Sequence, residues 1–392
     1  MATLDLSGLT ALPAQVWGAV RLVPLVRDRP ITDLRLHTRL YGDDPAVVTL
    51  PKEAAYTAYI PHGFVATWSD SPEASFGTDL TSPAATAPAS TCRLRFHRRM
   101  ARREDRDRLR FLPLHLAMEG YLALHFNGPT VLWEEWSQRA IRRGLSPRAE
   151  QAYAGARVEG LADALKLFEI HPDQCGVVLY VADALAAAFV VPHPDDYRTL
   201  HATLLLDMYG ELVHHYALLS APVPAFTARL DDTHVRTLDD LRAAANRQSA
   251  EWAAFHATTM AGGLLDASYD IRRVHEAGRF TLCRFLPGFR PKEENHIGEV
   301  ITDQRGRTAY LKTFRLSESQ IRRGHLLNTL ASHDWHLPTA AKSLGTTAHA
   351  FGLRLDQAGF GHLLSEHVLA GYRARARAAA KSTKSAKSTR ST

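Results

Sequence analysis

The sequence has few cysteines and no long apolar run. Its 392 residues include three cysteines, Cys92, Cys175 and Cys283, an odd number without a C-x-x-C pair. Neither a disulfide framework nor a zinc knuckle is indicated by this spacing. No stretch approaches the apolar run of about 20 residues that a membrane span needs, and the first residues lack a basic segment followed by an apolar one. We therefore expect a cytoplasmic protein without a membrane partner.

Motifs of common catalytic sites are also missing. The chain contains no G-x-x-x-x-G-K-[ST], no G-x-G-x-x-G, no H-E-x-x-H and no G-x-S-x-G. These patterns cradle phosphates, bind dinucleotides, hold zinc or present a nucleophilic serine. Their absence leaves the cofactor unknown, predicts no metal, and leaves open whether the protein is an enzyme.

The excess of basic over acidic residues is concentrated in two segments of a chain whose net charge is +6. Residues 93–110 hold nine Arg against three acids, and residues 373–392 hold seven Lys or Arg and no acid. The second segment has almost no large apolar side chain, so its composition predicts a disordered arm over 372–392. Such an arm attracts DNA or another polyanion by counterion release, although a solubilising tail is the alternative. Its cations are Arg373, Arg375, Arg377, Lys381, Lys384, Lys387 and Arg390.

The sequence before this tail predicts an α+β fold that is divided into three parts. These parts are a mixed domain with a β-hairpin and long helices at 1–220, a helix with a hairpin at 221–316, and a tri-helical module at 317–371. The Pro-containing linker SAPVPAF sets the boundary near residue 220.

Local signals place the elements of the first part. Apolar runs predict strands over 20–26, 46–50 and 54–60, whereas the Ser/Pro/Ala/Thr-rich residues 69–90 are typical of a loop. GVVLYVADALAAAFVV predicts a hairpin that turns at Ala182-Asp183, with a buried helix as the alternative. A long helix over 195–219 follows.

In the second part, Thr237 is expected to cap a helix that runs to about Met260. GRFTLCRFLPGF then predicts a strand, and HIGEVITDQRGRTAYLKTF predicts a hairpin that turns near Gly306.

The third part has the spacing of three packed helices. Ile321, Leu327 and Leu330 line one helix face, and Phe351, Leu355 and Ala358 line another. The segment resembles the Fis-type helix-turn-helix, whose pattern is matched by Ala340, Ala341, Leu344, Gly345, Leu355 and Gly359. This resemblance implies DNA binding through a recognition helix, whereas a structural cap or docking module is the alternative.

The predicted recognition helix presents few groups that read bases. It offers Thr347, His349 and Arg354, and only His349 and Arg354 could make strong contacts to base edges.

Two His-Pro-Asp triplets flank the predicted hairpin of the first part. His171 and Asp173 precede it, and His193 and Asp195 follow it, so both triplets should emerge at its open end. They could bind a divalent metal or act as an acid and base pair. The alternative is that the prolines shape loops and that Asp195, with Asp196, caps the next helix.

Two tryptophans also allow either a functional or a structural interpretation. Trp133 and Trp136 could form a stacking platform for an adenine or a base, or they could belong to the core.

Residues 168–219, together with VLWEEWSQRA upstream, resemble the ARG and rhodanese-phosphatase-superfamily-associated domain family. In that family a hairpin and a helix ending in Ser-Tyr-Ala-Leu recur, and this chain departs only at His215. The resemblance implies a link to ADP-ribose metabolism, hence an NAD-derived nucleotide as a partner of the first part.

We therefore expect a binding or regulatory protein that contacts nucleic acid through its C-terminal part. The alternative is an enzyme or binder of NAD-derived nucleotides, and protein partners are not predicted.

Overall fold

The computed structural model describes residues 2–34, 168–203 and most of 220–388, together with the backbone of seven short strands between residues 46 and 111. Trp133, Trp136, His215 and Arg390 lie outside the described residues, and so does the predicted helix beyond Thr203.

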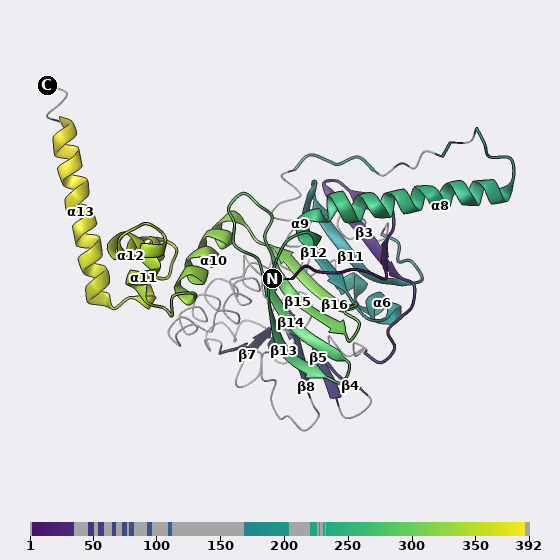
Figure 1. Cartoon of the computed structure of the whole chain (residues 1–392), viewed down its shortest axis with the longest axis horizontal. Helices are drawn as coiled ribbons and strands as arrows, with labels where there is room; N and C mark the ends of the chain where they lie inside the picture. The colour runs from purple at the N-terminus through teal and green to yellow at the C-terminus, as the bar shows by residue number, and fades with distance from the viewer. Residues whose placement is uncertain are drawn as a thin grey trace.

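A nine-stranded antiparallel sheet forms the centre of the fold (Figure 1). Its strand order is β1-β3-β11-β12-β16-β15-β14-β13, and β2 also pairs with β3. The strands are β1 Leu9–Ala11, β2 Gln15–Trp17, β3 Val20–Arg27, β11 Gln174–Val181, β12 Ala184–Val190, β13 Asp270–Ala277, β14 Phe280–Leu286, β15 His296–Asp303 and β16 Thr308–Arg315.

Both predicted hairpins are confirmed. Strands β11 and β12 turn at Ala182-Asp183, where Ala182 has a φ of 53°. Strands β15 and β16 turn at Gly306, whose φ of 79° is the left-handed conformation that glycine adopts without strain.

The sheet crosses the predicted boundary near residue 220. Strand β12 pairs with β16, with Phe189 opposite Lys312, so residues 1–220 and 221–316 contribute to one sheet. The linker after residue 220 therefore connects two halves of a sheet and does not separate two cores. A Pro-containing linker signals a break in local structure, but strand pairing between distant segments carries no local signal.

Two smaller sheets contain the strands between residues 46 and 111. The predicted strands over 46–50 and 54–60 are present as β4 and β5, whereas β7 and β8 lie in the segment that was expected to be a loop. The three-stranded sheet has the order β4-β5-β8, and the four-stranded sheet has the order β10-β6-β7-β9. Their bounds are β4 Ala46–Leu50, β5 Ala54–Ala58, β6 Val65–Thr67, β7 Glu73–Phe76, β8 Thr78–Thr81, β9 Cys92–Arg95 and β10 Leu109–Phe111.

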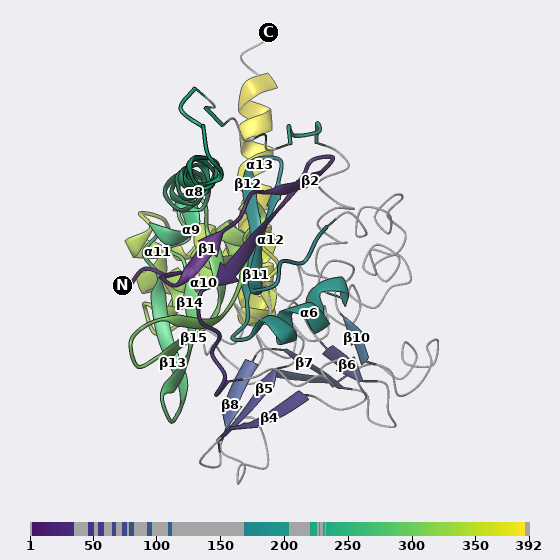
Figure 2. The ribbon, with the colours of Figure 1, turned by 90° about the vertical axis from the view of Figure 1, so that its right-hand side faces the viewer.

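Helices lie on both sides of the large sheet (Figure 2). On one side are α8 (Leu238–Phe255), the π-helical turn η3 (His256–Met260) and α9 (Gly262–Leu265). Helix α6 (Pro194–Thr203) packs against β11 on the other side. Thr237 caps α8 as expected, because its hydroxyl oxygen accepts a hydrogen bond from the Asp240 amide at 3.1 Å.

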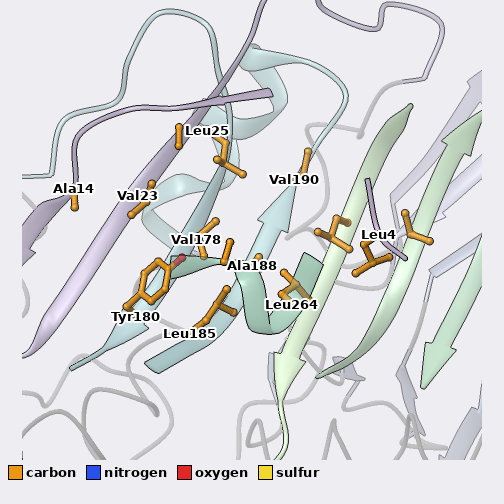
Figure 3. Packing of buried hydrophobic residues seen from close by; sticks show 14 of the residues in the cluster. Leu4, Ala14, Val23, Leu25, Val178, Tyr180, Leu185, Ala188, Val190 and Leu264 are labelled. Atoms are coloured by element: carbon orange, nitrogen blue, oxygen red, sulfur yellow. The ribbon is translucent and has the colours of Figure 1, made fainter. Parts of the chain in front are cut away.

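The main apolar core lies between the sheet and α9 (Figure 3). Val23, Val178 and Ala188 come from adjacent strands and are almost completely buried beside Leu264 of α9. Trp252 of α8 joins them and donates a hydrogen bond from Nε1 to the Leu12 carbonyl oxygen at 2.7 Å. Burial of this alternating strand face holds α8 and α9 against the sheet.

The C-terminal helices extend from one side of the sheet (Figure 1). They are α10 Glu318–Ala331, α11 Leu337–Ser343, α12 Ala348–Gln357, the 3-10 turn η4 Gly361–Leu363 and α13 Glu366–Ser388. Most of the predicted inward residues of these helices are buried, namely Ile321, Leu327, Leu330, Ala340, Ala341, Phe351 and Leu355, whereas Leu344 and Ala358 are only partly buried.

Glycine residues separate these helices as the spacing predicts. Gly345 has a φ of 61° in the turn between α11 and α12, and Gly359 has a φ of 90° after α12. No helix that the structure describes is long and apolar enough to span a membrane.

The basic tail differs from the disordered arm that its composition predicts. Helix α13 continues through this segment to Ser388. Ala, Arg and Lys are strong helix formers, so a segment that cannot build a core can still be helical when its start is anchored. Leu369 supplies part of this anchor, since its side chain is 8% exposed.

Candidate nucleic-acid interface

The start of α13 packs against α12 through Tyr372. The Tyr372 ring lies over Gly352, where an added Cβ would be 2.6 Å from a ring carbon. His349 meets the same ring edge to face, with 5.1 Å between ring centroids. Its Nε2 lies 2.9 Å from the Tyr372 carbonyl oxygen, and because a carbonyl only accepts, Nε2 carries the proton and donates.

An ion pair reinforces this contact one residue later. Arg373 Nε lies 2.9 Å from Asp356 Oδ2, and Arg373 Nη2 lies 2.7 Å from Asp356 Oδ1. Two parallel charge-assisted hydrogen bonds of this kind fix orientation as well as distance. They raise the pKa of Arg373 further above its usual value. We call the set His349, Gly352, Asp356, Tyr372 and Arg373 the α12–α13 contact.

The α12–α13 contact covers one face of α12, the predicted recognition helix. His349, Gly352 and Asp356 are spaced i, i+3 and i+7, which places them on one helix face, and α13 covers that face. Thr347 is the N-cap, and its hydroxyl oxygen accepts from the Ala350 amide at 3.1 Å. Arg354 is exposed and lies about 200° around the helix from Asp356.

Four basic residues that follow this contact have the spacing of one face of a helix. Arg377, Lys381, Lys384 and Lys387 follow Arg373 at spacings of four, four, three and three residues, within an arc of about 120° at 3.6 residues per turn. We call these four residues the α13 stripe. No acid follows Glu366 in α13, so the helix itself does not neutralise the stripe. Arg375, two residues from Arg373 and Arg377, is exposed on the opposite face.

The two His-Pro-Asp triplets lie at the open end of the β11–β12 hairpin, as the sequence predicts. Gly176 pairs with Val190 near the end of this ladder. His193 begins α6, because its carbonyl accepts from the Tyr197 amide at 3.2 Å and its Nδ1 accepts from the Asp195 amide at 3.2 Å. Thus the His193 side chain caps the first turn of that helix.

The first triplet also has contacts to the backbone. The Gln174 side-chain oxygen accepts from the His171 amide at 3.0 Å, and the Asp173 carbonyl accepts from the Arg27 amide at 3.0 Å. Among the residues that the structure describes, no three His, Cys, Asp or Glu side chains are placed to hold a metal ion. An acid and base role for His171 and His193 stays a prediction.

Sequence reasoning missed a buried charged row on the sheet. Arg284, Glu299 and Lys312 are direct partners on β14, β15 and β16. Arg284 Nε donates to Glu299 Oε1 at 3.0 Å, and Lys312 Nζ lies 3.4 Å from Glu299 Oε2. Burial lowers the pKa of Lys312, and Glu299 opposes this effect. Only the cross-strand register brings these residues together, so their sequence spacing gives no signal.

The fold defines an α+β protein with a large antiparallel sheet and an added set of C-terminal helices. The model of the ARPP-2 family matches residues 4–278, and the chain belongs to this family of ARG and rhodanese-phosphatase-associated proteins. The match ends just after β13, before the C-terminal helices. No curated protein and no solved structure matches the chain. A link to NAD-derived nucleotides stays a prediction.

Proposed function

We propose that the protein binds nucleic acid through its C-terminal helices, and that the α13 stripe makes the main contacts to phosphate groups. The observation that carries this proposal is the position of the four stripe residues on one face of a helix with no acid after its first turn. Arg377 and Lys381 are exposed, as phosphate contacts require. Cations arranged in this way gain affinity by releasing counterions from the nucleic acid.

Contacts of this kind position a protein on nucleic acid without reading its sequence. The α12–α13 contact engages His349 and Asp356, and capping engages the Thr347 hydroxyl oxygen. Arg354 is then the one exposed cation among the three predicted base-reading residues. We therefore propose binding that depends on phosphate contacts and has weak sequence preference.

Salt dependence of duplex binding tests the proposal. If all four stripe residues contact phosphates, a plot of log affinity against log salt concentration should have a slope of about −3 to −4. Replacing Arg377, Lys381, Lys384 and Lys387 by Gln should remove most of this slope and most of the affinity. An unchanged slope in this variant would reject the stripe as the binding surface.

Arg375 and Arg377 offer a matched comparison within the same helix. Each substitution, Arg375→Gln or Arg377→Gln, removes one exposed Arg and changes helix propensity equally. Because Arg377 belongs to the stripe and Arg375 faces the other way, Arg377→Gln should reduce the salt slope by about one and Arg375→Gln by less. Equal losses would show that total charge, and not the stripe, determines binding.

A further inference from the structure

The direction of α13 relative to α12 is fixed by groups just before the stripe. Arg373 lies one turn before Arg377, and both of its hydrogen bonds to Asp356 are shorter than 3.0 Å. The Tyr372 carbonyl is held by His349 in the same turn. These contacts set the direction in which α13 leaves α12, and Figure 1 shows α13 running away from α12.

Gly352 is explained by this anchoring. Glycine in the interior of a helix costs about 1 kcal/mol relative to alanine. Gly352 lies in the middle of α12, and its φ is in the ordinary helical region, so no turn requires it. The space that its missing Cβ leaves is filled by the Tyr372 ring, at 2.6 and 2.7 Å from where the Cβ would lie. Close approach of α13 is the structural reason for a glycine at this position.

We propose that the α12–α13 contact makes the protein select double-stranded over single-stranded nucleic acid, with Asp356 as the positioning residue. This inference rests on the proposed function. From Arg377 to Lys387 the stripe covers ten residues, or about 15 Å at a rise of 1.5 Å per residue.

The double helix holds the phosphates of a duplex in a regular array. A duplex stays stiff over about 150 base pairs, so this array changes little over the length of the stripe. A stripe held in one direction is preorganised for that array and loses little conformational entropy on binding. A single strand can adapt to the cations whether α13 is anchored or free, so anchoring should favour the duplex alone.

Asp356→Asn separates positioning from simple charge. This substitution removes a negative charge beside the stripe, so a purely electrostatic account expects tighter binding to every nucleic acid. Positioning predicts the opposite for duplex. We expect the dissociation constant for a 20-base-pair duplex to rise about fivefold as preorganisation is lost, with little change for a single strand of the same length.

Glu318→Gln is the matched control. Glu318 belongs to α10 of the same set of helices, pairs with Arg322 at 3.4 Å, and has a side chain that is 85% exposed. Its substitution removes the same charge without touching α13, and it should leave the ratio of duplex to single-strand affinity unchanged. A control that lowers this ratio as much as Asp356→Asn would overturn the inference.

A charge exchange tests whether the ion pair itself is responsible. The double variant Asp356→Arg with Arg373→Asp keeps the net charge and can form the pair in reverse, so it should regain duplex preference relative to Asp356→Asn. Limited trypsin cleavage after Arg375 and Arg377 reports independently whether α13 is anchored, and it should be faster in Asp356→Asn.

The possible results separate the two proposals. A stripe variant that binds duplex as well as the wild-type chain contradicts the proposed function. Two other results contradict the positioning role alone. One is that the wild-type protein binds duplex and single strand equally, in a salt-dependent way. The other is that Asp356→Asn binds duplex as tightly as wild type although trypsin cleaves α13 faster.

Discussion

The sheet and the C-terminal helices use charge in opposite ways. In the sheet, Arg284, Glu299 and Lys312 are buried and paired with one another across three strands. In α13, Arg377 and Lys381 are exposed on a helix that has no acid after its first turn. Buried charges need partners inside the protein, whereas exposed charges of one sign are available to a partner outside it. The same residue types therefore indicate stability in one region and binding in the other.

Breaking the buried row should produce the largest effect. Glu299→Gln would leave Arg284 and Lys312 buried beside each other without their carboxylate, and removal of one member of a buried pair costs about 3–5 kcal/mol. Urea denaturation should show this loss of free energy of unfolding.

The control for this variant is Glu276→Gln on β13. Glu276 pairs with Arg273 at 2.6 Å, but both side chains are more than half exposed, so the cost should be at most about 1 kcal/mol. Similar losses in the two variants would show that the buried row is no more important than a surface pair.

The second largest effect should be a loss of free energy of unfolding at acidic pH. Burial lowers the pKa of His201 and of His256 to about 4. An unfolded histidine has a pKa near 6.5, so between these values the unfolded chain binds more protons than the folded chain. The stabilising contribution of each neutral imidazole is complete above about pH 6.5 and falls toward pH 4, by roughly 3 kcal/mol for each histidine.

His256→Gln tests this assignment. A glutamine side-chain amide can donate or accept a hydrogen bond with the Tyr180 hydroxyl, which lies 3.0 Å from His256 Nε2, but it does not titrate. Denaturant midpoints measured from pH 4 to pH 8 should therefore depend less on pH in the variant. Equally steep curves in both proteins would assign the acid sensitivity to other groups.

The sequence predicted the elements whose signals are local. The Ala182-Asp183 and Gly306 turns, the Thr237 cap and the buried Ala340 and Ala341 depend on neighbouring residues, and the structure confirms them. The pairing of β12 with β16 and the contact of Asp356 with Arg373 join residues whose spacing carries no pattern. The lack of apolar residues in the tail predicts disorder, whereas the helix propensity of its Ala, Arg and Lys favours the helix that the structure contains.

The candidate site was predicted only in part for the same reason. Composition located the cations, but it could not show that four of them share a face, because that requires knowing that the segment is helical. The helix pattern also places His349 outward on the third predicted helix, where no further helix is expected to cover it, whereas α13 does so in the structure. A recognition helix looks the same in sequence whether or not another helix packs on its outer face.

Substitution of Arg354 should have the smallest effect, and it decides whether α12 contributes any sequence readout. Arg354 is exposed, points away from the covered face of α12 and lies on a different side from the α12–α13 contact. If it adds only long-range attraction, Arg354→Ala should weaken binding to a selected duplex and to a scrambled duplex equally, with little change in thermal stability. If it reads a base, the loss should be confined to the selected duplex and should amount to about 1–3 kcal/mol, the contribution of one good base contact. We expect equal losses, because the Thr347 hydroxyl oxygen caps α12 and His349 is held in the α12–α13 contact, which leaves Arg354 as the one exposed cation among the three predicted base-reading residues.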